Sequence, residues 1–405
     1  MSTDYSQITV ARQPIFDKNL NTYAYELLYR SRLESDNIEA DGSFDDVATS
    51  NVISYTFMDF GLDRVVGNRV AFLNMTRNFL IDSDPLPMVK DQVVLEILED
   101  IIVDDEVVAG VKNLVEQGYK IALDDFIFNE SWWPLIKLAH IIKLDILAID
   151  EQQLRQHVEM LKKEDVLLLA EKVETQEQYE MCKELDFDFY QGYFFTKPTL
   201  VQDVTLAANQ VSILNLLTKL QNPGVEFDEI EQIVSTDLNL SYKLLKLLNS
   251  AAVGLPRKID SIHQGLVILG FRAIRSWSTL IALSSIKTDI PELMTVGLVR
   301  AKMCEQIADE FGVEKETAFL VGLFSVLEAL MAHPMSELLT LIPLSDSVKE
   351  ALLDQSGELG PLLKTVMLYE QGLWDNITDS PLDKEQLSTA YVDAAYWTIN
   401  TELSQ

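Results

Sequence analysis

Oxygen-bearing and cationic side chains stand at the ends of short apolar runs throughout the first half of the chain. They are, in chain order, Glu26, Asn74, Glu96, Asp124, Asp125, Lys143, Asp145, Glu171, Glu174 and Gln191. A single acid at such a place is most simply explained as the solvated end of a strand. If several acids converge, they repel one another unless a divalent cation neutralises them, and all-oxygen ligation suits Mg²⁺ or Mn²⁺. Lys143 among them could hold a phosphate oxygen or an attacking water, so the joint pattern favours a metal-dependent hydrolase of a phosphate compound.

Alternating strand and helix patterns position these side chains. Strands are predicted at residues 8–15, 70–74, 93–99, 120–125, 141–145, 167–174 and 189–195, and Glu26 ends a further strand-like run in "YAYELLYR". Helical patterns at residues 45–60, 106–117 and 175–185 lie between them. So many βα units within about 200 residues predict an α/β fold with a (β/α)8-type barrel, or else an open doubly wound sheet. In a barrel, the ends of the strands form one catalytic rim.

Helical patterns replace the strands in the second half of the chain. "SYKLLKLLNSAAV", "FRAIRSWSTLIALSSI" and "ETAFLVGLFSVLEALM" are each predicted to be one helix, and Gly, Pro, Asn or Asp residues separate such segments. The stretch "TKPTLVQDV" is the expected seam. We therefore predict two domains, a barrel over residues 1–200 and an all-helical domain over residues 201–405.

The charge of the chain limits its partners. Its 64 acidic and 32 basic residues give a formal net charge of -32, so attraction to a nucleic-acid polymer, which needs clustered Lys and Arg, is not expected. A small anionic ligand would need local basic residues or a bound cation to reverse this field.

Cysteine and histidine usage excludes several kinds of site. The two cysteines, Cys182 and Cys304, lie far apart, which fits a reducing cytosol and excludes a disulfide scaffold or a cysteine zinc cage. The four histidines are scattered, and no Gly-x-Ser-x-Gly, Gly-rich phosphate loop or His-Glu-x-x-His motif occurs. No signal sequence or run of about 18 apolar residues is found, so a cytoplasmic protein without a membrane segment is expected.

The polar residues lie in motifs that together resemble the EAL family of cyclic di-GMP phosphodiesterases. Over residues 6–200 the motifs follow the family's order: "YELLYR", "FLN", "EILE", "LDDF", "KLD", "AEKVET" and "QGYFFTKP". Glu26-Leu27-Leu28 stands where the family has Glu-Ala-Leu. Residues 200–400 are similar to an HDOD domain, in "STDLNLSYKLLKLLNSA", "KIDSIHQGLVILG" and "GLFSVLEALM". Such domains lack the metal-binding His-Asp pair of the related HD phosphohydrolases, and no His-Asp doublet occurs in this chain.

The resemblance implies a two-metal site for Mg²⁺ or Mn²⁺ that hydrolyses cyclic di-GMP to pGpG. The metal ligands it implies are Glu26, Asn74, Glu96, Asp124 and Asp125. The catalytic residues it implies are Lys143, at the attacking water or the phosphate, Glu171, as general base or second-metal group, and Asp125. Arg30, Glu174 and Gln191 would surround the ligand, and Glu99 would anchor a loop. The HDOD half would be a regulatory or interaction module for an unknown signalling protein, and the barrel could form a homodimer.

The loop after Asp125 departs from the family pattern. Ile127 replaces the glycine that follows "DDF", and isoleucine resists the positive φ that glycine allows. Trp132 and Trp133 follow, and packing is the simpler explanation for them than ligand stacking. A catalytically weak or inactive barrel that acts as a cyclic di-GMP receptor or a protein scaffold is therefore the alternative to an enzyme, and a barrel kept for structure alone is a third possibility.

Overall fold

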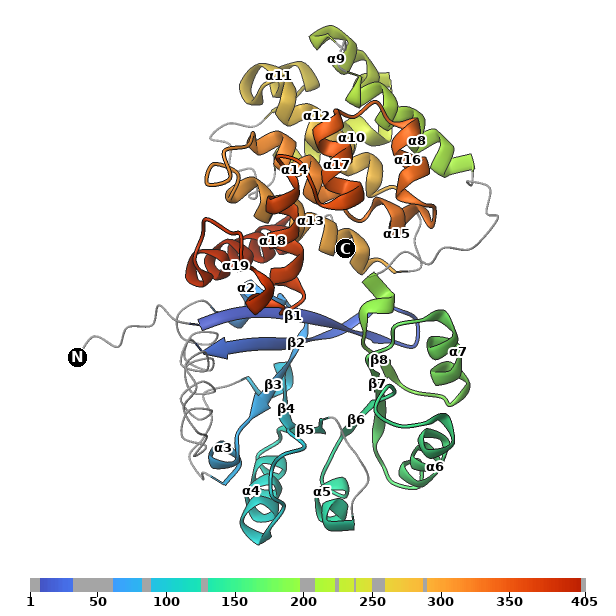
Figure 1. Ribbon diagram of the computed structural model, residues 1–405, viewed down its shortest axis with the longest axis vertical. Coiled ribbons are helices and arrows are strands. Elements are labelled where there is room, and N and C mark those ends of the chain that lie inside the picture. Colours follow the sequence, from blue (N-terminus) through green and yellow to red (C-terminus); the bar gives the residue numbers. More distant parts are fainter. Residues whose placement is uncertain are drawn as a thin grey trace, which may run out of the picture. The chain divides into compact units, whose positions relative to one another are not determined.

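The computed structural model describes residues 8–31, 61–81, 89–124, 130–196, 208–222, 226–236, 238–249, 259–286 and 290–401 (Figure 1). The chain divides into two compact units, Met1–Phe195 and Thr196–Gln405. The boundary expected after residue 200 lies outside the described residues. Within the ranges above, no helix has the length and apolar character needed to cross a membrane.

The first unit is a closed barrel, which confirms the barrel prediction over the open sheet. Its strands are β1 (Ile8–Asp17), β2 (Thr22–Ser31), β3 (Val70–Met75), β4 (Val93–Ile97), β5 (Lys120–Leu123), β6 (Ile141–Asp145), β7 (Leu167–Glu171) and β8 (Phe189–Tyr190). They pair in chain order from β1 to β8, and β1 then pairs with β8 to close the barrel. Neighbours from β2 to β8 are parallel, whereas β1 is antiparallel to both β2 and β8.

The antiparallel first strand corrects the prediction that Glu26 ends a strand. Only residues 18–21 connect β1 to β2, and so short a link can join only antiparallel strands. The resulting hairpin pairs from Ile8↔Ser31 inward, which extends β2 five residues beyond Glu26. Glu26 therefore lies in the middle of its strand.

The last strand is shorter than the predicted strand over residues 189–195. After β8 the chain enters a 3-10 turn at Tyr193–Thr196. Gly192 causes the change, because it has a φ of 151° and a Cβ there would lie 2.2 Å from the carbonyl oxygen of Val173. The chain thus turns where it packs closely on the segment after β7.

Helices surround the barrel (Figure 1). They are α2 (Leu62–Val66), α3 (Arg77–Ile81), α4 (Asp105–Glu116), α5 (Trp133–Ile136), α6 (Glu151–Leu161) and α7 (Gln176–Glu184). The longer ones begin at side-chain caps: Asp104 accepts a hydrogen bond from the Val107 amide, and Thr175 and Gln178 form a capping box. The helix predicted over residues 45–60 lies outside the described residues.

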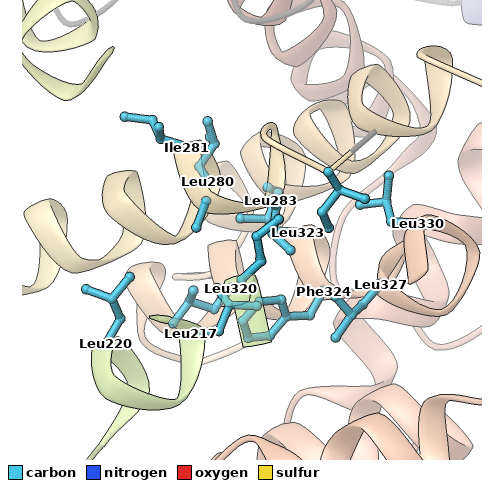
Figure 2. Close-up of a cluster of buried hydrophobic side chains, with 14 of the residues drawn as sticks. Leu217, Leu220, Leu280, Ile281, Leu283, Leu320, Leu323, Phe324, Leu327 and Leu330 are labelled. Atoms are coloured by element: carbon cyan, nitrogen blue, oxygen red, sulfur yellow. The ribbon is translucent and has the colours of Figure 1, made fainter. Parts of the chain in front are cut away.

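The second unit contains helices and no strand in the part that the structure describes. They are α8 (Ala208–Gln221), α9 (Phe227–Thr236), α10 (Leu238–Leu248), α11 (Ile262–Leu269), α12 (Phe271–Leu283), α13 (Glu292–Gln306), α14 (Lys315–Phe324), α15 (Leu327–Met331), α16 (Met335–Leu341), α17 (Asp346–Asp354), α18 (Gly360–Glu370) and α19 (Lys384–Asn400). Figure 2 shows buried leucines of α8, α12, α14 and α15 meeting in one core. This is the expected all-helical half.

One predicted helix is broken. The run over residues 316–331 divides into α14 and α15 at Ser325. The Ser325 hydroxyl donates to the Gly322 carbonyl at 2.7 Å and accepts from Arg300 at 3.1 Å. Such a bond from serine to the preceding turn competes with regular helix geometry.

Arg300 also forms the main buried ion pair of this unit, and its removal tests how the helices are held. Its guanidinium donates two hydrogen bonds to Glu370, at 2.7 and 2.9 Å, and the side chains are only 4% and 15% exposed. Glu370→Ala should lower the free energy of unfolding by about 3–5 kcal/mol, because it removes the carboxylate that accepts two hydrogen bonds from the buried Arg300 guanidinium.

The matched variants separate the lost charge from lost packing. Glu370→Gln keeps an acceptor oxygen and should lower the free energy of unfolding by less than Glu370→Ala does. The R300M/E370M double variant removes both charges and should lower it least. These values come from urea unfolding of the full chain. A double variant as unstable as Glu370→Ala would contradict the explanation.

Candidate active site

A layer of polar side chains lies directly above an apolar layer inside the barrel. The apolar layer contains one residue from each strand: Ile15, Ala24, Phe72, Val94, Ala122, Ile141, Leu169 and Phe189. Because side chains of a strand alternate between its two faces, the residue two positions along each strand faces the same way. Two positions toward the carboxyl-end rim, those residues are Gln13, Glu26, Asn74, Glu96, Asp124, Lys143, Glu171 and Gln191.

Backbone pairing holds this layer in register. Asn74 lies opposite Glu96 in the ladder between β3 and β4. Asp124 and Gln191 come just after their strands, but their amides still donate to the carbonyls of Ile97 and Ala170, at 2.9 and 2.8 Å. The chain is thus fixed at these two positions.

Lys143 is the centre of the polar layer. Its side chain is 0% exposed, and its ammonium contacts carboxylates from four other strands or strand ends. The N···O distances are 2.7 Å to Glu96, 2.7 Å to Asp124, 3.0 Å to Glu171 and 3.3 Å to Glu26. The structure therefore brings together five of the residues that the sequence singled out.

Burial and charge shift the proton affinities of this group. Burial would lower the pKa of Lys143, but the carboxylates of Glu26, Glu96, Glu171 and Asp124 raise it well above its usual value. Burial raises the pKa of Glu171 to about 8, although Lys143 partly offsets the rise. The same two opposing causes leave the pKa of Glu96 well above its ordinary value. With its pKa raised to about 8, Glu171 carries a proton near neutral pH, and this proton reduces the negative charge that Lys143 must balance.

The donor set fits a hard divalent cation. Glu26, Glu96 and Asp124 each offer one carboxylate oxygen, and these oxygens lie within 4.8 Å of one another. None of the described residues donates a hydrogen bond to Glu96 Oε2 or to Glu171 Oε2, although both atoms are buried. A buried carboxylate oxygen without a donor is costly unless a cation or an ordered water satisfies it. The residues present therefore fit Mg²⁺ or Mn²⁺.

Two glutamines border the carboxylates, and only Gln191 was predicted from the sequence. Gln191 Nε2 donates to Glu26 Oε2 at 2.7 Å and to Gln13 Oε1 at 3.0 Å. Gln13 is also the register partner of Glu26. It was missed because it precedes an apolar run in the sequence, and only the antiparallel direction of β1 brings it to the rim. Its position two residues before the inward-facing Ile15 was the available signal.

The other predicted site residues lie away from the cluster around Lys143 or outside the described residues. Glu99 and Glu174 are exposed, at the turn after β4 and just before α7, and the structure does not bring them into the cluster around Lys143. Asp125 and Ile127 lie outside the described residues, as does the side chain of Arg30. Of the two tryptophans, Trp132 is buried and Trp133 is half-buried.

Comparisons with known proteins agree with this architecture. A profile of the EAL domain matches residues 4–198, and a profile of the HDOD domain matches residues 206–342. YuxH, an uncharacterized protein of Bacillus subtilis, is 31% identical over 97% of this chain and 98% of its own. The cyclic di-GMP phosphodiesterase CdgJ of Vibrio cholerae is 32% identical over 96% of this chain and 91% of its own.

A solved structure, BlrP1 of Klebsiella pneumoniae with calcium and cyclic di-GMP, aligns with 47% of this chain and 55% of that chain, at 21% identity and a TM-score of 0.39. The relationship to the two full-length relatives is the stronger finding, since it extends across both halves. It confirms the resemblance seen in the motifs. The chain belongs to the EAL family, in the arrangement in which an EAL domain is followed by an HDOD domain.

Proposed function

We propose that the barrel hydrolyses cyclic di-GMP to linear pGpG with Mg²⁺ or Mn²⁺ held at its carboxyl-end rim. The observation that carries the proposal is the group of buried carboxylates around Lys143, with oxygens that no described residue satisfies. A relative of nearly the same extent, CdgJ, is a cyclic di-GMP phosphodiesterase. A phosphodiester carries negative charge, so this acidic rim can accept it only with cations bound.

The resemblance to the EAL family suggests which residues would hold each cation. Glu26, Asn74, Glu96 and Asp124 would hold one cation, and Asp124, Asp125, Glu171 and Gln191 would surround a second. A pair of divalent cations at such a rim supplies an activated water and stabilises the leaving oxygen of a phosphodiester. Asp125 enters this proposal from the sequence alone.

The other residues would act on the water and on the ligand. Glu171 would accept a proton from the attacking water, and Lys143 would orient that water or a phosphate oxygen. As the new bond between the water oxygen and phosphorus forms, the bond from phosphorus to a ribose 3′ oxygen breaks and that oxygen takes up a proton. Arg30 and Glu174 would contact the ligand, and Glu99 would anchor the adjoining loop.

The HDOD unit would serve regulation or protein interaction. None of the four histidines in the chain is followed by aspartate, so the hydrolytic His-Asp pair of related domains is missing from the sequence. The alternative reading of the barrel as a receptor depends on Ile127, which lies outside the described residues. Turnover therefore decides between the enzyme and the receptor.

Incubation of the full chain with cyclic di-GMP and Mn²⁺ should give pGpG, and a chelator should abolish the product. Glu96→Gln should reduce turnover to background, because an amide offers a weaker ligand than a carboxylate. Glu180→Gln is the matched control, since Glu180 is an exposed acid on α7 that accepts from Gln176. Binding of cyclic di-GMP without product, and with Glu96→Gln indistinguishable from wild type, would favour the receptor.

Lys143→Met should destabilise the metal-free protein by about 3–5 kcal/mol, because it removes the ammonium that contacts four buried carboxylates. The loss should shrink when Mn²⁺ is added, since the cation supplies the missing charge. Thermal unfolding with chelator and with Mn²⁺ measures both effects. If the variant and the wild type unfolded alike in chelator, the ammonium would not hold the cluster together.

Metal uptake near pH 7 should release protons. Glu171 has its pKa raised to about 8, so this residue binds more protons in the folded metal-free protein than in the unfolded chain between the ordinary glutamate value and pH 8. The contribution of Glu171 to stability in chelator should therefore fall as pH rises through this window. Calorimetric titration with Mn²⁺ in two buffers of different ionisation enthalpy counts the released protons. Glu171→Gln should release fewer, and an equal number would exclude Glu171 as their source.

A further inference from the structure

An ion pair joins the ends of β6 and β7 immediately outside the site. The Lys172 ammonium lies 2.6 Å from Asp145 Oδ2, and the two side chains are 49% and 13% exposed. Asp145 follows Lys143 by two residues, and Lys172 directly follows Glu171. The pair thus connects the two strands that carry Lys143 and Glu171.

Lys172 adopts a backbone conformation that favours glycine. Its φ is 56°, one of five positive values at non-glycine positions among the described residues. The other four lie in the hairpin turn after β1 or directly after helices, where such values are common: Leu20, Asp186, Ala332 and Gln355. Lys172 instead ends a barrel strand at the candidate site. A left-handed residue there needs support from its surroundings.

The backbone on both sides of Lys172 is fixed by hydrogen bonds. The Glu171 carbonyl accepts from the Ile146 amide at 3.4 Å, and the Val173 amide donates to the Gln191 carbonyl at 3.0 Å. The chain therefore turns at Lys172, between Glu171, which is bonded to the end of β6, and Val173, which is bonded to the end of β8.

Hydrogen bonds also fix the side chain of Asp145, the partner of Lys172. Its Oδ1 accepts from the amides of Leu147 and Ala148, at 2.7 and 3.2 Å, which shapes the turn after β6. In the ladder it is the register partner of Glu171. One oxygen of Asp145 thus organises its own loop while the other holds Lys172.

We propose that Lys172 and Asp145 are positioning residues that hold Glu171 against Lys143, whose side chains meet at 3.0 Å. The proposal rests on the proposed function for its kinetic consequence. Neither residue touches the reacting atoms. The ion pair fixes the turn at Lys172, the turn fixes the last residue of β7, and the carboxylate of Glu171 is thereby directed into the cluster.

Variants of both partners test the proposal in the full chain with Mn²⁺ and cyclic di-GMP. Lys172→Met and Asp145→Asn each remove the charge pair while keeping the side-chain stem or the turn acceptor. Each should lower kcat about 10-fold with little change in KM, as expected for groups that orient a catalytic carboxylate. The double variant should lose no more than either single variant. Lys172→Arg keeps a cation and should retain most activity.

Lys172→Gly separates the ion pair from the backbone conformation. Glycine adopts the left-handed region freely, so a wild-type kcat in this variant would show that only the turn matters and would overturn the proposal. A loss equal to that of Lys172→Met supports the ion pair. Arg155→Met is the control, because it removes an exposed ion pair with Glu151 on α6 and should leave kcat and KM unchanged.

A failure of the proposed function can be distinguished from a failure of the positioning role. If the wild type gives no pGpG, the proposal that the barrel is an enzyme fails. The Mn²⁺ affinity measured by calorimetry then tests the positioning role of Lys172 and Asp145. Lys172→Met and Asp145→Asn should weaken Mn²⁺ binding about 10-fold if they misdirect Glu171. Unchanged affinity, or additive losses in the double variant, would overturn the positioning role.

Discussion

The contact of the Lys143 ammonium with four buried carboxylates is the interaction on which the rest of the barrel depends. Charges of one sign cannot be gathered in a water-poor rim without a partner, and the energy of an unpaired buried charge is large compared with the stability of a domain. Lys143 is fully buried, and Glu26, Glu96, Asp124 and Glu171 each reach it from a different strand or strand end. Strand register must therefore be correct around the whole barrel, since a shift of one residue would turn a carboxylate away.

The two-residue repeat of the strands explains how much of this arrangement the sequence could predict. Each apolar run contains a residue that faces the barrel interior, and the polar residue two positions later on the same strand also faces the interior. Asn74, Glu96, Asp124, Lys143 and Glu171 were predicted because each ends or follows such a run, and the barrel was predicted from the succession of strand and helix patterns. Gln13 was missed and Glu26 was placed at a strand end, because both depend on the direction of β1. A four-residue link reveals that direction only when residues 8–17 and 22–31 are taken as two strands of one hairpin.

Interactions between distant residues account for the remaining differences. The short β8 results from the close approach of Gly192 to Val173, and the break between α14 and α15 accompanies the bonds of Ser325 with Arg300 and Gly322. Neither contact leaves a periodic pattern in the local sequence. The helical unit was still predicted as a class, since its core is built from the leucine repeats of α8, α12, α14 and α15 (Figure 2).

The same electrostatic constraint links the candidate chemistry to the outer residues. The raised pKa of Glu171 means that a proton on this residue, together with Lys143, balances the cluster near neutral pH in the protein without metal. A divalent cation can take over this balance only if the carboxylates already point to a common centre, because rearranging buried charges would consume much of the binding energy. Asp145 and Lys172 form an ion pair at the ends of β6 and β7, and we propose that this pair fixes the strand ends that carry Lys143 and Glu171. The inner cluster thus sets the charge of the site, and the outer ion pair sets its geometry.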